Sequence, residues 1–301
     1  METIGVTSVS FSNNKNLVHN LKVSHPKAKI ILSKTKRSRS KLIDLIKRCD
    51  KMIVGLDTID KHAISYAKKL KTISKYGVGL NNIDLKECNK KKIRVIYTKG
   101  VNKRSVSELV LSSTIFLSRN LYNSNIRIKQ GKWIVKGGEN LSEKSFGIIG
   151  FGNVGKDLAK ILTPLNCKIY YNDILKFKDV AKRYISKSKK FIYSNCDFIS
   201  LHLPLTEKTK NLINKKSLKE MKKNTILINT SRGGLINEKD LFYFLQKKKI
   251  KGAVLDVFEK EPFLKKRILN LDNLIALPHI GGSSKESILN MGHAAIRNLK
   301  Y

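Results

Sequence analysis

The chain has 301 residues, of which 41% are hydrophobic, so it is long enough for two domains with ordinary cores. No stretch approaches the ~20 apolar residues that cross a membrane, and the N-terminus lacks the basic flank and apolar core of a signal peptide. The four cysteines form no C-x-x-C pair, which indicates a reducing compartment and no metal site. We therefore expect a cytoplasmic protein.

The charge is strongly basic, because 61 Lys and Arg against 23 Asp and Glu give a formal net charge of +38. Such a balance is typical of proteins that bind nucleic acid or anionic surfaces. Here the lysines are spread along the whole chain and aromatic residues are not interleaved with them, unlike the grooves that bind single strands. We do not expect nucleic-acid binding, and attraction of an anionic substrate is a more economical use of the charge.

Short β-like runs alternate with helical patterns along the chain, which predicts an α/β fold with parallel sheets. In the first part, the expected strands cover residues 30–32, 52–54, 71–74 and 93–97, and the expected helices cover residues 40–49 and 60–70. A domain boundary near Lys99-Gly100 precedes a long helical pattern over 105–119. The segment 130–140, which contains the single tryptophan, is interpreted as an arm that packs against a partner subunit.

A glycine cradle for phosphate follows the strand expected at 145–149 and precedes a helical pattern. Gly150 permits a tight turn, Gly152 lets the backbone approach a pyrophosphate, and Gly155 lets the helix pack close to the sheet. The N-terminus of the helix offers unpaired N–H groups and partial positive charge. The expected phosphate-binding residues are Gly150, Gly152, Asn153, Val154 and Gly155.

Asp173 ends the next expected strand, where a carboxylate can accept hydrogen bonds from the adenosine ribose. It would repel a 2′-phosphate, so the sequence favours NAD over NADP. Lys176 and Lys178 lie nearby and weaken that inference.

Three apolar runs in the last third of the chain each end on a polar group suited to hydroxy-acid chemistry. In neighbouring parallel strands these groups would face one crevice. Arg232 would bind a substrate carboxylate through its planar fork of donors. His279 would exchange the hydroxyl proton, because its ordinary pKa lies near working pH, and Glu261 would orient its ring. Each could instead be structural: a surface ion pair, a packed histidine or a solvated acid.

Two rivals and one supporting residue stand near these groups. His202 also ends a strand, but its place before Pro204 suits the cofactor side better, and Glu259 is the rival to Glu261. Asp256 could accept a hydrogen bond from the nicotinamide carboxamide.

The chain resembles the D-isomer-specific 2-hydroxyacid dehydrogenases, especially their D-3-phosphoglycerate dehydrogenase branch. The resemblance rests on residues 75–84, 100–102, 105–109, 150–155, 201–206, 229–234, 256–262 and 278–283. It implies two Rossmann-like or flavodoxin-like parallel-sheet domains, with the cofactor domain (100–282) inserted in the substrate domain (1–99 plus 283–301). It also implies a homodimer that uses NAD.

The resemblance places the family's catalytic residues at Arg232, Glu261 and His279. The substrate-binding residues that it implies are Tyr76, Gly77, Val78, Gly79 and Asn102. Further cofactor-binding residues are expected at His202, Pro204, Thr206, Thr230, Ser231, Asp256, Gly281 and Gly282.

One departure concerns the substrate phosphate. Many phosphoglycerate dehydrogenases carry an arginine just after the strand at 52–54, where this chain has Gly55-Leu56-Asp57-Thr58. A phosphate would need other cations, for which the sequence offers Lys34, Lys36, Arg37 and Arg39. Because only residues 280–301 follow His279, the resemblance implies a short form without a regulatory domain.

The sequence therefore predicts an NAD-dependent D-2-hydroxyacid dehydrogenase, which oxidises 3-phosphoglycerate to 3-phosphohydroxypyruvate for serine synthesis. Reduction of glyoxylate, hydroxypyruvate or another 2-oxo acid is the alternative within the enzyme class. An NAD-sensing, dehydrogenase-like corepressor is the alternative of another class, and the basic charge is its only support.

Overall fold

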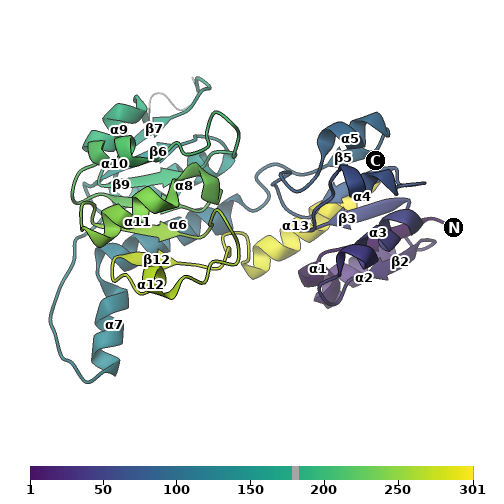
Figure 1. Ribbon diagram of the computed structural model, residues 1–301, viewed down its shortest axis with the longest axis horizontal. Coiled ribbons are helices and arrows are strands. Elements are labelled where there is room, and N and C mark those ends of the chain that lie inside the picture. Colours follow the sequence, from purple (N-terminus) through teal and green to yellow (C-terminus); the bar gives the residue numbers. More distant parts are fainter. Residues whose placement is uncertain (178–182, 301) are drawn as a thin grey trace. The chain divides into compact units, whose positions relative to one another are not determined.

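The chain forms two compact units, and the computed structural model describes residues 1–177 and 183–300 (Figure 1). Unit 1 comprises Met1–Asn102 and Gly282–Tyr301, and unit 2 comprises Lys103–Gly281. Unit 1 thus joins both ends of the chain. The described residues contain no helix that is both long and apolar enough to cross a membrane.

Unit 1 is built on a five-stranded parallel sheet in the order β2-β1-β3-β4-β5, the order of flavodoxin-like doubly wound folds. Its strands are β1 (Thr3–Val6), β2 (Lys29–Leu32), β3 (Lys51–Val54), β4 (Thr72–Lys75) and β5 (Arg94–Ile96). The sequence analysis did not predict β1, although its four residues are buried between β2 and β3. A run of four residues is too short to show a period.

Six helices cover the two faces of this sheet in the described part of unit 1. They are α1 (Val9–Asn13), α2 (Lys15–Ser24), α3 (Arg39–Arg48), α4 (Lys61–Ser65), α5 (Leu85–Lys90) and α13 (Lys285–Asn298). One apolar core lies under α1, α2 and α13, and the other lies under α3, α4 and α5. The C-terminal helix α13 is tied to β4 because the Ser74 hydroxyl donates to the Ala295 carbonyl over 2.8 Å. The helix expected at 60–70 is shorter than predicted, beginning after the N-cap Asp60.

Unit 2 is built on a seven-stranded parallel sheet in the order β12-β11-β10-β9-β6-β7-β8. Its strands are β6 (Ser145–Ile149), β7 (Lys168–Asn172), β8 (Ile185–Ser186), β9 (Phe198–Leu201), β10 (Ile226–Asn229), β11 (Gly252–Leu255) and β12 (Leu274–Ala276). The strand order reverses between β6 and β9, which is the switch point where Rossmann folds bind dinucleotides. The prediction of an α/β fold with two Rossmann-like or flavodoxin-like parallel sheets is confirmed.

Helices cover both faces of this second sheet as well. They are α6 (Lys103–Ser118), α7 (Leu121–Lys129), α8 (Asn153–Leu162), α9 (Lys189–Asn195), α10 (Lys215–Glu220), α11 (Glu238–Gln246) and α12 (Lys266–Leu269), with short 3₁₀ turns at Thr163–Leu165 and Gly233–Leu235. One core packs under α9, α10 and α11, and the other packs under α6 and α8. Helix α7, which the sequence analysis did not predict, has no buried residue and extends away from the sheet of unit 2 (Figure 1).

Candidate active site

The three predicted catalytic residues follow three neighbouring strands of unit 2. Strand β11 pairs in parallel with both β10 and β12, so the carboxyl ends of all three lie at one edge. Arg232 follows β10, Glu261 follows β11 and His279 follows β12. The sheet therefore brings together segments that are far apart in the sequence.

His279 and Glu261 are in direct contact. The His279 Nδ1 lies 2.9 Å from the Glu261 Oε2, and the other carboxylate oxygen, Oε1, accepts the Phe258 N–H over 3.1 Å. Both side chains are partly open to solvent in this unit, at 41% and 39% exposure, so the ion pair itself adds little stability. Its effect is on geometry: when Nδ1–H donates to the carboxylate, Nε2 is left to exchange a proton.

The Arg232 guanidinium is half-buried, and burial lowers its pKa while the Glu261 carboxylate partly offsets the shift. The turn that carries it is fixed by Asn229, a fully buried residue whose amide donates to the Arg232 carbonyl over 2.8 Å. Gly233 packs directly on the chain after β11, since a Cβ there would lie 1.9 Å from the Phe258 carbonyl carbon. An arginine that keeps its charge with few waters around it is a strong anion ligand.

Asp256 holds the turn that carries His279. Its side chain is fully buried, and its two oxygens accept the N–H groups of Ile280 and Gly281 over 2.7 Å each. His279 has a φ of +57°, a left-handed conformation that is uncommon for residues other than glycine. The two hydrogen bonds follow immediately after that residue. The predicted contact of Asp256 with a carboxamide stays a prediction, and the sequence analysis missed its contact with this turn.

The cofactor cradle has the space that a dinucleotide needs. Gly150 has a φ of +96°, and a Cβ there would lie 2.3 Å from the His202 carbonyl oxygen. Gly152 caps the N-terminus of α8, and a Cβ there would meet no atom of the other described residues within 4 Å, its chain neighbours apart. A Cβ at Gly155 would lie 2.3 Å from the Gly150 carbonyl oxygen, so α8 packs closely on the turn. The turn is thus closely packed at Gly150 and Gly155 and open at Gly152, at the N-terminus of α8, where a pyrophosphate would fit.

Asp173 lies beside this cradle, at the end of β7. Its Oδ2 accepts the Phe151 N–H over 2.6 Å and its Oδ1 accepts the Leu175 N–H over 2.9 Å. These bonds fix the carboxylate, and each oxygen keeps acceptor capacity for a ribose hydroxyl. Lys176 is exposed, and Lys178 lies outside the described residues.

The remaining cofactor candidates of unit 2 lie at the ends of β9, β10 and β12. The His202 Nδ1 and the Thr230 hydroxyl are buried and have no hydrogen-bond partner among the described residues, and burial lowers the pKa of His202 to about 3. A histidine that stays neutral is poorly suited to the proton exchange assigned to His279. Ser231 donates to the Leu201 carbonyl over 2.6 Å, while Pro204 and Thr206 are exposed, and Gly281 is buried beside Asp256. Among the described residues, no group of His, Cys, Asp and Glu is placed to hold a metal.

The substrate candidates of unit 1 divide into backbone and core positions. Gly77 has a φ of +122°, and Val78 and Gly79 are half-buried in the same loop. Asn102 lies next to Gly282, where a Cβ would be 3.1 Å from the asparagine amide nitrogen.

Tyr76 instead points into the core of unit 1. It packs edge-on against Phe11 with ring centroids 5.7 Å apart, and its hydroxyl lies 3.4 Å from the Ile288 carbonyl oxygen. A substrate role for Tyr76 can therefore rest only on its backbone.

Beneath the Gly77 loop the sequence analysis missed a buried lysine. The Lys75 ammonium donates to the Gly55 carbonyl and to the Asn82 side-chain oxygen, the latter over 2.8 Å. The Asn82 amide nitrogen donates to the carbonyls of Gly55 and Asp57 over 3.0 and 2.6 Å. These bonds join the end of β3 to the loop after β4. The only sign of this buried lysine in the sequence was its position at the end of a predicted strand.

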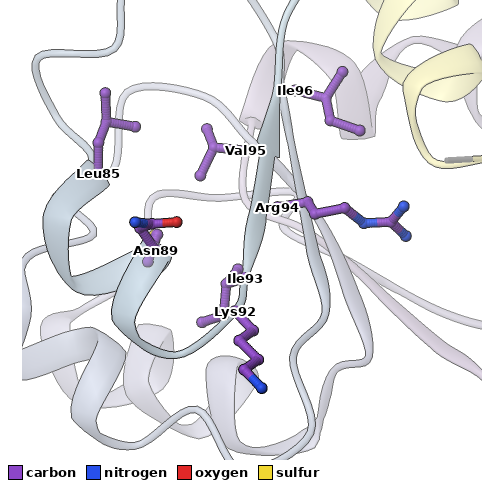
Figure 2. A pocket seen from close by; sticks show the side chains of 8 residues that line it. Leu85, Asn89, Lys92, Ile93, Arg94, Val95 and Ile96 are labelled. Carbon is purple, nitrogen blue, oxygen red and sulfur yellow. The ribbon is translucent and has the colours of Figure 1, made fainter.

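A separate groove lies between α5 and β5 at the edge of the unit 1 sheet (Figure 2). It is lined by Leu85, Cys88, Asn89, Lys92, Ile93, Arg94, Val95 and Ile96. None of the predicted site residues lines it.

Comparison with known proteins gives a consistent result. Residues 111–281 match the model of the D-isomer specific 2-hydroxyacid dehydrogenase, NAD binding domain. The hydroxypyruvate reductase of Thermotoga maritima is 36% identical over 261 residues, which cover 84% of this chain and 85% of that protein. The D-3-phosphoglycerate dehydrogenase of Methanocaldococcus jannaschii is 35% identical over 269 residues, which cover 87% of this chain and 51% of that protein. The NAD-bound 3-phosphoglycerate dehydrogenase of Entamoeba histolytica has a TM-score of 0.85 at 28% identity, covering 99% of this chain and 94% of that one.

Proposed function

Since the chain belongs to the D-isomer-specific 2-hydroxyacid dehydrogenases and is an NAD-dependent oxidoreductase, we propose that Arg232, Glu261 and His279 are its catalytic residues. The observation that carries the proposal is the contact of 2.9 Å between the His279 Nδ1 and Glu261, at the carboxyl edge of the sheet in the NAD-binding unit. The segments at Gly77–Gly79 and Asn102 of unit 1 are proposed to bind the substrate.

Each residue then has one task. Arg232 binds the carboxylate of a D-2-hydroxy acid and so orients its C2 carbon. His279 takes the hydroxyl proton at Nε2, and the Glu261 carboxylate stabilises the imidazolium that forms. Bound NAD supplies the acceptor for the hydride that leaves C2. In the reverse direction His279 returns the proton to the carbonyl oxygen of a 2-oxo acid.

We propose glyoxylate or hydroxypyruvate as the substrate, rather than 3-phosphoglycerate. Two of the cations that the sequence offered for a phosphate are already used within unit 1. Arg37 donates to the Leu32 carbonyl over 3.0 Å, and Arg39 pairs with Asp60. Gly55, which stands where many phosphoglycerate dehydrogenases have arginine, supplies no cation.

Oxidation of 3-phosphoglycerate is the second candidate. Its support is the 35% identity to a named D-3-phosphoglycerate dehydrogenase and the formal net charge of +38. A role in serine synthesis follows only if this substrate is turned over. A cytoplasmic location also stays a prediction.

The test is a spectrophotometric assay of the purified protein. NADH oxidation is measured with glyoxylate and hydroxypyruvate, and NAD reduction is measured with D-glycerate and 3-phosphoglycerate. We expect kcat/KM for the oxidation of D-glycerate, the hydroxy acid that corresponds to hydroxypyruvate, to exceed that for the oxidation of 3-phosphoglycerate, since the two rates are then compared in one direction. The opposite order would establish the second candidate, and an absence of turnover with all four would refute the proposed function.

The role of Arg232 is tested by Arg232→Ala. We expect kcat/KM for the 2-oxo acid to fall by about 10²-fold or more, through both a higher KM and a lower kcat, because the lost carboxylate contact also orients C2. Arg267→Ala, an exposed position on α12, is the matched control. Unchanged kinetics of Arg232→Ala would show that another cation binds the carboxylate.

We further propose that unit 2 pairs with a second copy of the chain through the segment from α7 to residue 135. Helix α7 has no buried residue, and a nine-residue helix is marginal without packing. Trp133 and Val135 are 83% and 90% exposed, which is unusual for large apolar side chains close together. Light scattering should give the mass of a dimer, and Trp133→Ser combined with Val135→Ser should lower it. A monomeric parent protein would contradict this pairing.

A further inference from the structure

The segment that carries Glu261 has little structure of its own. Residues 256–265 form no helix or strand, and Glu259, Lys260 and Glu261 are exposed. Fixing a single backbone residue costs about 1–2 kcal/mol, so such a segment keeps one conformation only through outside contacts. The position of Glu261, and with it the ring of His279, therefore depends on what holds this segment.

Phe258 and Phe263 anchor the segment to the core, where Phe263 packs on Phe242 of α11 with ring centroids 5.7 Å apart. Two further contacts, from the β10–α11 region, hold the backbone beside Glu261. Gly233 lies directly beneath it, because a Cβ there would be 2.1 Å from the Phe258 carbonyl oxygen and 2.3 Å from the Glu259 nitrogen. The Glu238 Oε1, at the first residue of α11, accepts the Glu259 N–H over 2.6 Å. This is a charge-assisted hydrogen bond, which is stronger than a neutral one.

Stabilisation of α11 alone does not explain where the Glu238 carboxylate lies. A carboxylate in the first turn favours a helix even when it is exposed to water. Glu238 is instead half-buried, and burial together with the neighbouring carboxylates Glu259 and Glu261 raises its pKa, although the hydrogen bond from the Glu259 N–H and the charge of Lys265 partly offset them. The site thus holds three carboxylates close together, at a cost that a solvated side chain would avoid.

We propose that Glu238 is a positioning residue for the proposed reaction: its hydrogen bond to the Glu259 N–H fixes the segment that carries Glu261. Glu261 in turn keeps the Nδ1–H of His279 engaged and its Nε2 directed to the substrate. Glu238 itself touches neither substrate nor cofactor in this account. The inference rests on the proposed function, but its structural part can be tested without turnover.

The experiment compares Glu238→Ala with Glu238→Gln in the full chain. The glutamine side-chain oxygen still accepts the Glu259 N–H, whereas alanine removes the acceptor. Glu220→Gln, at the end of α10, is the matched control for loss of a carboxylate from the same unit. The readouts are kcat, KM for NADH, and the NMR resonance of the His279 Nδ1–H, which reports its hydrogen bond to Glu261 and is assigned by difference from His279→Asn.

We expect Glu238→Ala to lower kcat by about tenfold, with KM for NADH within twofold, because only the reacting geometry is disturbed. The His279 Nδ1–H resonance should move upfield in this variant, since a displaced Glu261 no longer accepts its hydrogen bond. Glu238→Gln should restore most of kcat and keep that resonance near its position in the parent protein.

Three results would overturn the proposal: Glu238→Ala within twofold of the parent kcat, an unchanged His279 Nδ1–H resonance in that variant, or a Glu238→Gln variant as impaired as Glu238→Ala. If Glu238→Ala does not fold, Glu238→Asp replaces it, because its shorter side chain keeps the charge but withdraws from the N–H. If the parent protein turns over none of the acids, the NMR measurement still decides about Glu238 while the proposed function fails.

Discussion

Two aspartates at opposite ends of the unit 2 sheet show how differently one residue type can be used. Asp197 precedes β9, at the amino edge of the sheet. It accepts the Ser145 N–H over 2.9 Å and the Lys222 ammonium over 2.6 Å. Burial alone would raise the pKa of Asp197, but these hydrogen bonds outweigh it and lower the pKa to about 2.

Asp256 follows β11, at the carboxyl edge of the same sheet. It accepts the backbone N–H groups of Ile280 and Gly281, and burial raises its pKa because those bonds offset the lost hydration only in part. The comparison indicates that the charged form of Asp197, at the amino edge, stabilises the folded protein. The charged form of Asp256, at the carboxyl edge, is destabilised by burial while its hydrogen bonds hold the turn. Perturbed groups of this second kind are typical of functional sites.

The largest expected effect is on activity at the carboxyl edge. Asp256→Asn keeps an acceptor for one N–H but opposes the other with its own amide donors, so the turn that carries His279 loosens. We expect kcat to fall by about 10²-fold while KM for NAD changes little. The melting temperature should change by only a few degrees, since a costly buried charge is also removed.

Steady-state kinetics measures kcat and KM for NAD, and thermal unfolding measures the melting temperature. Asp272→Asn, at an exposed position, is the control. A large rise in KM for NAD with an unchanged kcat would assign Asp256 to the carboxamide instead.

The next effect is on stability at the amino edge. Asp197→Asn should lower the free energy of unfolding at pH 7 by about 2 kcal/mol, since a pKa lowered from 3.8 to about 2 corresponds to that much linkage energy and the side chain is only 15% exposed. The pKa of Asp197 is lower in the folded protein than in the unfolded chain. The stabilisation is therefore fully present above pH 3.8 and is lost as the pH falls through about 2. Parent and variant should therefore converge in urea unfolding at the acid end. The kcat of the variant should stay within twofold, and a clear loss of activity would break the contrast between the two edges.

A smaller effect is expected at the cradle. Gly152→Ala should weaken NADH binding by about tenfold, because its methyl group enters space that a pyrophosphate would occupy, while the melting temperature stays unchanged. Gly150→Ala is the contrasting variant, since its Cβ meets the His202 carbonyl and its φ is +96°, so it should lose stability as well. Fluorescence titration with NADH and thermal unfolding separate the two results. Equal affinity in the Gly152→Ala variant would show that the cofactor does not approach there.

The sequence predicted the fold class, and it predicted that Arg232, Glu261 and His279 follow the carboxyl ends of neighbouring parallel strands. Alternation of strands and helices is a local signal, and Arg232, Glu261 and His279 each stand a few residues after an apolar run. Because parallel strands end at one edge of a sheet, the three side chains could be predicted to lie at the same edge. A central strand, β1, was missed because four residues carry too little pattern.

The contacts that fix the site could not be predicted in the same way. Asp256 reaches Ile280 and Gly281, and Glu238 reaches Glu259, across more than twenty residues with no periodic pattern to announce them. In the sequence, Asp256 and Glu238 cannot be distinguished from solvent-exposed acids, because their hydrogen-bond partners are known only from the structure.

The left-handed backbone of His279 has a use in the laboratory. Asparagine is among the few side chains that adopt a φ near +57° readily, so His279→Asn is the substitution that best keeps the turn while it removes the imidazole. Under the role proposed for His279, this variant would bind substrate and NAD without turning them over. Crystals of the variant soaked with NAD and candidate acids offer a way to trap the reactants and to see which acid binds.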